Sequence, residues 1–117
     1  MLKDCTINLL MTLFEITLQA RLDQKNIFRI YYLALYQDLF DNWVVKTAFG
    51  RVGTPGRQLF YVTKQKQEAI KEIRNSLFRR LSAPKRIGAR YHCLALTDPT
   101  NLLKQDSSLK KIREAFG

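Results

Sequence analysis

One segment alternates strictly between apolar and polar residues, and it restricts the fold more than any other feature of the chain. The alternation runs over residues 14–22: Phe14, Ile16, Leu18, Ala20 and Leu22 are separated by Glu15, Thr17, Gln19 and Arg21. Successive side chains of a β-strand point to opposite sides, so a period of two predicts a strand with one buried face and one face in water. The chain is therefore expected to contain a sheet.

Three more strands are expected after this one, at about 28–36, 43–52 and 58–63, with polar turns between them. The first of them, FRIYYLALY, is apolar or aromatic on both faces, which predicts a central strand covered on two sides. Before the last, Pro55-Gly56 is the pairing that a type II turn favours, because proline presets φ and glycine accepts a positive φ. Together these strands predict an antiparallel meander.

The period then changes to that of a helix, and the expected helical face consists of Ala69, Ile70, Ile73, Leu77, Phe78 and Leu81. Thr63 is the expected N-cap, and Pro84 is expected to end the helix. Residues 85–88 are expected to be a basic loop, followed by a fifth strand at 89–96. A last amphipathic helix, capped by Ser107 or Ser108, carries Leu109, Ile112, Ala115 and Phe116.

The predicted fold class is α+β: a small, twisted antiparallel sheet of about five strands, one amphipathic helix packed on it and a short C-terminal helix. A chain of 117 residues has room for one such domain. The expected division is an N-terminal extension at 1–13, the domain at 14–96 and a helical tail at 97–117. Because the clear pattern begins after Met11, both Met1 and Met11 remain candidate starts.

The formal net charge is +10, and nearly all of the excess lies in one window. Residues 51–90 contain eleven Lys and Arg residues against only Glu68 and Glu72, whereas residues 1–50 have a balanced charge. A concentrated block of this kind is typical of a surface that binds phosphates. The alternative is a solvated basic face with no partner.

Several classes of function fit the sequence poorly. Cys5, Cys93 and His92 are too few for a closed zinc site, and two free thiols suit a reducing cytoplasm. The acids are scattered with no pair for acid–base catalysis, and the glycines lack the spacing of a phosphate loop. No segment reads as an export signal or a membrane span. We therefore expect a cytoplasmic protein that is not an enzyme and has no cofactor, metal or membrane partner.

The stretch from Trp43 to Arg57, WVVKTAFGRVGTPGR, resembles the signature of the WGR domain. That family is named for a Trp-Gly-Arg tripeptide, here Phe49-Gly50-Arg51, which is followed by Val/Ile-Gly and a tight turn. Further similar features are the aromatic strand at 26–33, Asp38-Leu39-Phe40, the helix containing Ala69, and the closing Gly88 and Tyr91. The resemblance spans about residues 14–91 and suggests a free-standing, bacterial-type WGR protein.

The resemblance implies binding to DNA. In the poly(ADP-ribose) polymerases that carry this domain, the Trp stacks on a sugar at a DNA end, and the Arg joins phosphate and interdomain contacts. Phe49 keeps a stacking face but is smaller and lacks the indole N–H. Charge and resemblance together predict these nucleic-acid-binding residues: Phe49, Gly50, Arg51, Arg57, Lys64, Arg74, Arg79, Arg80, Lys85, Arg86 and Arg90.

Three kinds of partner are compatible with the sequence. DNA is the first, bound through its backbone or its ends, and RNA fits the same charges and aromatic residues. The third is a protein: the chain would then be an accessory module of a separately encoded enzyme. In that hypothesis Arg51 contacts an acidic protein, and Leu109, Ile112 and Phe116 form a docking face on the last helix.

Overall fold

A computed structural model describes residues 12–105 and 107–116. The strands are β1 (Thr12–Leu22), β2 (Ile27–Gln37), β3 (Trp43–Arg51), β4 (Arg57–Thr63) and β5 (Tyr91–Thr97). The helices are the 3-10 turn η1 (Asp23–Lys25), α2 (Lys66–Leu81), α3 (Ala83–Arg86), α4 (Leu102–Gln105) and α5 (Ser107–Phe116). The expected extension at 1–13, with Cys5, lies almost entirely outside the described residues.

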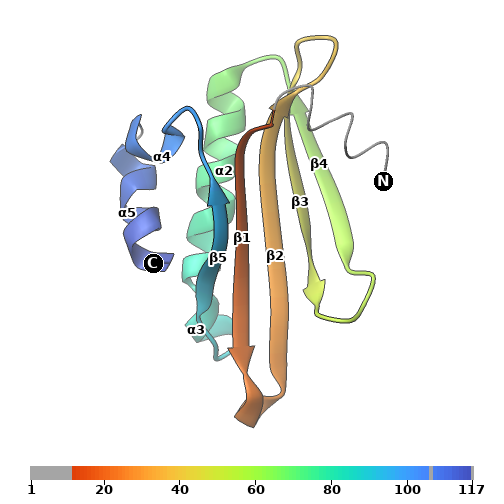
Figure 1. The fold of residues 1–117 in the computed structure, drawn as a ribbon, viewed down its shortest axis with the longest axis vertical. Helices are drawn as coiled ribbons and strands as arrows, with labels where there is room; N and C mark the ends of the chain where they lie inside the picture. Colours follow the sequence, from red (N-terminus) through yellow and green to blue (C-terminus); the bar gives the residue numbers. More distant parts are fainter. Residues whose placement is uncertain (1–11, 106, 117) are drawn as a thin grey trace.

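The strands form a single antiparallel sheet in the order β4-β3-β2-β1-β5, which confirms the predicted α+β fold (Figure 1). β1 to β4 are the expected meander, because each is joined to the next by a short turn. The chain then crosses the sheet through α2, and β5 pairs with β1 at the far edge. This crossing brings the C-terminal end of α2 to the same end of the sheet as the β3–β4 hairpin.

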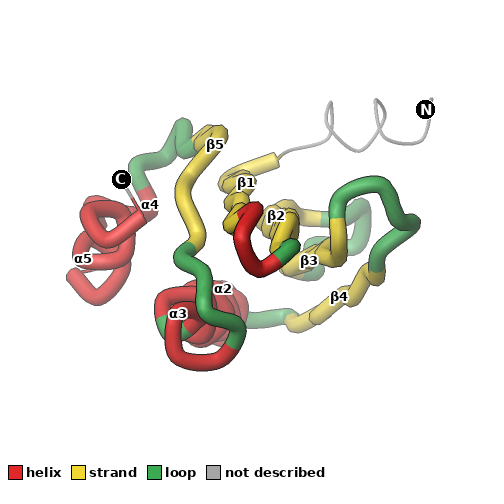
Figure 2. Tube along the Cα trace, turned by 90° about the horizontal axis from the view of Figure 1, so that it is seen from below, coloured by secondary structure: helices red, strands yellow, loops and turns green. Residues whose placement is uncertain are grey.

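The core lies between the sheet and the helices, which cover one face of it (Figure 2). β1 supplies the predicted alternation, and its inward residues from Phe14 to Ala20 are at most 2% exposed. β2 is central, as predicted, and its two faces are covered to different degrees. Leu33 and Leu35 are buried under the helices. On the other face Ala34 is buried as well, whereas Ile30 and Tyr32 are half-buried.

α2 begins two residues later than expected. Its N-cap is Gln65, whose side chain makes no capping bond, and the Thr63 hydroxyl accepts a hydrogen bond from the Gln65 amide instead. The buried stripe holds Ser76 in place of Phe78, which is 43% exposed. The helical period is therefore right, but the apolar face is rotated so that Phe78 lies at its margin.

The segment after α2 is more helical than the sequence predicted. α2 ends at Leu81, before Pro84, and the proline is then accommodated in the first turn of α3. A proline is tolerated there because the first amides of a helix have no helical partner. Lys85 and Arg86 thus belong to a short helix and not to a loop. The connection after β5 likewise contains α4, whose first amides bond to the carboxylate of Asp98.

α5 lies against α2 and closes the core on the side of the sheet where β5 lies (Figure 1). Leu109 and Ile112 are fully buried, and Phe116 is 2% exposed. The hypothesis that these three side chains form a docking face for another protein is therefore wrong: they fill the chain's own core. The proposed boundary at 96/97 between domain and tail stays a prediction, although α5 shares this core.

Candidate nucleic-acid interface

The β3–β4 hairpin is built on glycines that allow two backbone segments to approach closely. A Cβ on Gly50 would lie 2.8 Å from the Cα of Gly56, and one on Gly56 would lie 2.9 Å from the Phe49 carbonyl oxygen. Gly56 and Gly53 also have positive φ angles, +72° and +89°. Gly50, predicted as a binding residue, has a clear structural role here, because it lets β3 and the start of β4 lie together.

The hydrogen-bonded turn lies earlier in the hairpin than the Pro55-Gly56 pair suggested. The Thr54 amide donates to the Arg51 carbonyl at 3.1 Å, and the Thr54 hydroxyl donates to the same oxygen at 2.7 Å. Gly53 therefore occupies the turn position that needs a positive φ. Pro55 and Gly56 instead lead the chain from this turn into β4.

Phe49, at the signature position, projects to the helix-bearing side of the sheet. Its ring is stacked on that of Tyr31, with 6.0 Å between centroids and 30° between planes. Tyr31 lies directly across from Phe49 in the β2–β3 register, and Arg57 lies across from Phe49 in the β3–β4 register. The half-buried aromatic face is thus bordered by a cation from the neighbouring strand.

Arg80 reaches the same group of side chains from the last turn of α2. Its guanidinium carbon lies 4.3 Å from the centre of the Tyr31 ring, a cation–π distance. The row Arg80, Tyr31, Phe49 and Arg57 therefore crosses from helix to hairpin. It joins the two halves of the basic window, 51–57 and 79–86, at one end of the molecule (Figure 1).

Among the described residues, Arg80 has no carboxylate counter-ion. Burial, together with its neighbours Arg86 and Arg79, lowers the pKa of Arg80 below its ordinary value, while Tyr31 and Tyr91 act in the opposite direction. Its Nε is buried without a hydrogen-bond acceptor among the described residues. Because a buried polar group without a partner is unfavourable, an anion that bonds to this guanidinium would be stabilised.

Arg51 is exposed, but its guanidinium is already engaged. It donates one hydrogen bond to the Asn26 carbonyl and one to the Asn26 side-chain oxygen, each 2.8 Å long. Asn26 has φ +54° and closes the turn between β1 and β2. The signature arginine therefore links the β1–β2 turn to the hairpin tip, and phosphate binding would use its remaining donors or exchange these bonds.

The remaining predicted residues divide into two groups. Arg79, Arg80, Lys85, Arg86 and Arg90 lie at the hairpin end, together with Arg57 and Arg51. Arg86 donates to Ser82 and to the Arg79 carbonyl, and Arg90 donates to the Ala115 carbonyl. Lys64 and Arg74 lie elsewhere: Lys64 follows the other end of β4 and donates to the Phe40 carbonyl at 3.2 Å, and Arg74 lies in the middle of α2.

Two cations of this end were missed because they belong to the half of the sequence with balanced charge. Arg29 is the direct partner of Arg51 in the β2–β3 register and is exposed. The Lys25 ammonium lies 2.9 Å from where a Cβ of Gly88 would be, so it reaches the loop before β5. Pairing the two strands about their shared turn would have placed Arg29 opposite Arg51.

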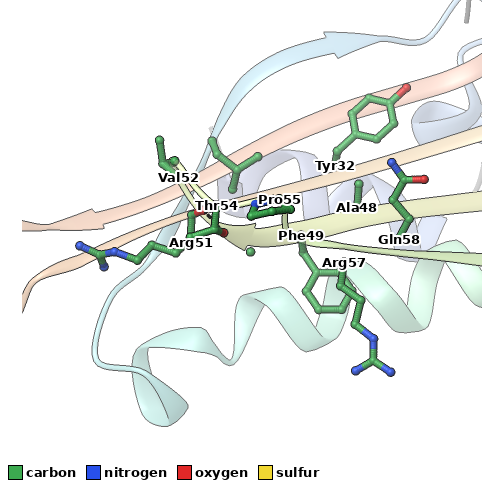
Figure 3. A pocket seen from close by; sticks show the side chains of 13 residues that line it. Tyr32, Ala48, Phe49, Arg51, Val52, Thr54, Pro55, Arg57 and Gln58 are labelled. Atoms are coloured by element: carbon green, nitrogen blue, oxygen red, sulfur yellow. Dashed lines mark hydrogen bonds between the residues drawn. The ribbon is translucent and has the colours of Figure 1, made fainter.

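An open pocket of about 310 Å³ lies beside the hairpin on the other face of the sheet. Figure 3 shows Tyr32, Ala48 and Gln58 on that side of β3, whereas Phe49 and Arg57 project to the opposite side. The pocket walls are therefore mainly neutral, and the cations at its rim point away from it. This pocket and the row of Arg80, Tyr31, Phe49 and Arg57 therefore lie on opposite faces of the sheet.

The chain was compared with models of known protein families. A family model, described as the WGR domain, matches residues 14–83. The chain belongs to the WGR family. WGR domains are modules of the nucleic-acid-binding type found in poly(ADP-ribose) polymerase-like proteins, so the chain is a module of this type. A comparison with curated proteins gave no match.

Within this WGR domain the signature tripeptide is divided between two roles. Phe49 and its neighbours supply an aromatic and cationic surface, whereas Gly50 and Arg51 hold the hairpin in place. In the described ranges no three His, Cys, Asp or Glu side chains gather as metal ligands. Among the helices that the structure describes, none is long and apolar enough to cross a membrane.

Proposed function

We propose that this WGR protein binds the phosphate backbone of DNA, at duplex ends in particular, through the hairpin end of the sheet. The observation that supports this most directly is the row of Arg80, Tyr31, Phe49 and Arg57, which joins the helix and the hairpin into one surface. None of its cations forms an ion pair with a carboxylate within the described residues. They are therefore available for phosphates.

The chemistry of this surface suits backbone binding better than base reading. Guanidinium groups bind phosphate oxygens through paired hydrogen bonds, and such contacts carry no sequence information. The half-buried ring of Phe49 offers a face to a sugar or a terminal base pair. The surface has no row of amide side chains suited to the edges of bases, so we expect low sequence specificity.

We further infer that the protein acts by binding and not by catalysis. The hairpin end brings together cations and aromatic rings, whereas general acid–base or nucleophilic chemistry needs a positioned carboxylate, imidazole or thiol beside the substrate. Of the described candidates, His92 is exposed on β5 at the far edge of the sheet from the hairpin. We therefore propose a non-catalytic role for this domain.

The direct test is fluorescence anisotropy with blunt, nicked and single-stranded DNA and with duplex RNA. Affinity should fall by at least about tenfold between about 50 mM and about 200 mM salt, because several phosphates release counterions. Tighter binding of blunt DNA than of RNA is the expected order. The absence of any binding at low salt would refute the proposal.

β4 offers a matched pair of variants for placing the site. Arg57→Gln removes a cation at the hairpin end, and Lys64→Gln removes one just beyond the opposite end of the same strand. Arg57→Gln should weaken DNA binding by about three- to tenfold and lower the salt slope by about one, while Lys64→Gln changes affinity by less than about twofold. Equal effects of the two variants would show that only overall charge matters.

A further inference from the structure

β4 is an edge strand whose residues are almost all exposed. From Arg57 to Val62 every residue is exposed, and only Thr63 is half-buried. The four central side chains are large and apolar, with exposed fractions of 47% for Leu59, 56% for Phe60, 37% for Tyr61 and 55% for Val62. An exposed apolar strand at the edge of a sheet is a template for pairing with another strand.

Both faces of this edge contribute to the apolar surface. Leu59 and Tyr61 lie opposite Thr47 and Val45, so they continue the face that holds the core. Phe60 and Val62 lie opposite Lys46 and Val44 and continue the open face. α2 leaves the centre of this edge uncovered: its first residue, Lys66, lies over the Trp43 ring at the start of β3, yet Leu59 to Val62 stay exposed.

The opposite edge, β5, is protected in a way that β4 is not. The β1–β5 register shifts between Thr17 and Leu18, so Leu94 has no direct partner and marks a bulge. Bulges at sheet edges disturb the regular row of amides and carbonyls and prevent pairing. The β3–β4 register, in contrast, is regular from Trp43/Thr63 to Phe49/Arg57. β4 also contains no proline and no lysine.

The charges around β4 are all of one sign. No Asp or Glu occurs between Trp43 and Gln67, whereas this stretch contains Lys46, Arg51, Arg57, Lys64 and Lys66. Arg57 and Lys64 border the apolar centre of β4 at its two ends. Lys46 lies over the Phe60 ring, with its ammonium 5.9 Å from the centroid. The edge is therefore apolar in the middle and cationic at both ends.

This charge pattern argues against a second copy of the chain as the partner. In an antiparallel, two-fold pair centred on Phe60, Arg57 would stand opposite Thr63 of the copy and beside its Lys64. Like charges at neighbouring cross-strand positions are destabilising. Each copy would also bring a net charge of +10. An extended segment with acidic ends meets the same edge without this repulsion.

We propose that the free edge of β4 binds an extended segment of another protein, with an apolar centre and acidic residues at both ends. The segment adds a sixth strand to the five-stranded sheet through main-chain hydrogen bonds, and its apolar side chains cover Leu59 to Val62. Its acids lie beside Arg57 and Lys64. The two interfaces share Arg57 at the hairpin end of β4, but the apolar centre from Leu59 to Val62 lies outside the row of Arg80, Tyr31, Phe49 and Arg57, so substitutions there distinguish peptide binding from DNA binding.

The probe for this site is a synthetic, end-blocked octapeptide, Asp-Glu-Val-Tyr-Val-Ile-Glu-Asp, added to the isotope-labelled full chain and followed by NMR. The amide signals of β4 should shift in the fast-exchange range, with weaker shifts in β3. The same peptide with lysines in place of its four acids should bind at least about tenfold more weakly. Shifts confined to the hairpin end, or no shifts at millimolar peptide, would refute the proposal.

Two further peptides test for strand addition itself. Each carries N-methyl groups on alternate backbone amides, one on the odd residues and the other on the even residues. Only one edge of the added strand can face β4, so one set should abolish the shifts and the other should preserve them. Equal tolerance of both sets would mean that the peptide contacts side chains alone, which contradicts the proposal.

Val62→Glu and Leu94→Glu form a matched pair on the two edges, because both side chains are 55% exposed. Val62→Glu should weaken binding of the acidic peptide by at least about fivefold, and Leu94→Glu by less than about twofold. Both should retain the DNA affinity of the wild type to within about twofold, so failure here is distinct from failure of the DNA proposal. Shifts of Leu59 to Val62 that depend on protein concentration, or that DNA itself produces, would favour self-association or nucleic acid at this edge and overturn the proposal.

Discussion

The guanidinium of Arg80 lies over the ring of Tyr31, with its central carbon 4.3 Å from the ring centre. Arg80 comes from the end of α2 and Tyr31 from the middle strand of the sheet, so this contact joins elements that are far apart in sequence. It also holds a positive charge beside the aromatic ring of Phe49. The contact therefore connects the packing of the domain with its proposed function.

Replacement of Arg80 by methionine should separate binding from stability. Arg80→Met keeps the side chain's length and packing, removes a buried Nε that has no acceptor among the described residues, and loses the cation–π contact. Because these effects oppose one another, the free energy of unfolding should change by less than about 1 kcal/mol. DNA affinity should fall by about three- to tenfold. Denaturant titration and anisotropy measure the two quantities, and a large loss of stability with normal binding would contradict this role.

The Arg51→Lys substitution should affect stability more than DNA binding. Arg51→Lys retains the charge but cannot reproduce the two hydrogen bonds to Asn26. The variant should lose about 0.5–1 kcal/mol of unfolding free energy, a small value because the pair is exposed. The salt dependence of DNA binding should stay unchanged. Arg51→Ala adds the loss of charge, and a comparison of the two variants by denaturation and anisotropy isolates each contribution.

Gly50 should be less replaceable than Gly53. A Cβ there would lie 2.8 Å from the Cα of Gly56, and backbone atoms cannot move away without disturbing the turn. Gly50→Ala should therefore cost about 2 kcal/mol or more. Gly53→Ala meets no atom within 4 Å but keeps φ +89°, so it should cost only about 1 kcal/mol. Thermal unfolding of both variants would reveal the order, and a reversed order would argue against the close approach.

The residue at the signature position should control the preference for DNA ends. Phe49→Trp enlarges the stacking face and adds an indole N–H beside Arg57. It should tighten binding to blunt ends by about two- to fivefold, because a base–aromatic stack of this kind is worth about 1–3 kcal/mol in full. Binding to a closed DNA circle of equal sequence should not improve. Equal gains on both substrates would assign the ring to general backbone contact.

Alkaline pH should destabilise the fold through Tyr31. Burial raises the pKa of Tyr31 above its ordinary value of 10.0, although the neighbouring Ser76 and Arg80 act in the opposite direction. Above pH 10.0 the unfolded chain loses this proton and the folded chain retains it, so the free energy of unfolding falls as pH rises. The contribution is complete below the unfolded pKa and is lost as pH passes through the folded pKa. Tyr31→Phe should flatten this decline in denaturant titrations; an unchanged slope would exclude Tyr31 as its source.

The sequence by itself determined the five strands, the long helix α2 and the family. The alternation at 14–22 predicted β1 because a half-buried strand leaves its period directly in the residues, and the spacing from Ala69 to Leu77 predicted α2 in the same way. The stretch from Trp43 to Arg57 identified the WGR signature before any contact was known. These features are local, so neighbouring residues suffice to specify them. The cap at Gln65 and the exposure of Phe78 depend on where the chain leaves β4. Local patterns therefore predicted the wrong cap, Thr63, and placed Phe78 on the buried face.

Only the tertiary structure decided which charges act together. Residues 51–90 looked like one basic block, but Lys64 lies beyond the far end of β4, and Arg29, from a segment with balanced charge, lies opposite Arg51. Arg51 itself is held by Asn26, whereas Arg80 has a buried Nε with no hydrogen-bond acceptor in the part of the chain that the structure describes. Strand order and the crossing of α2 produce this arrangement, and both follow from burial of the whole core. A charge near the surface leaves no period in the sequence, so its neighbours are known only once the chain is folded.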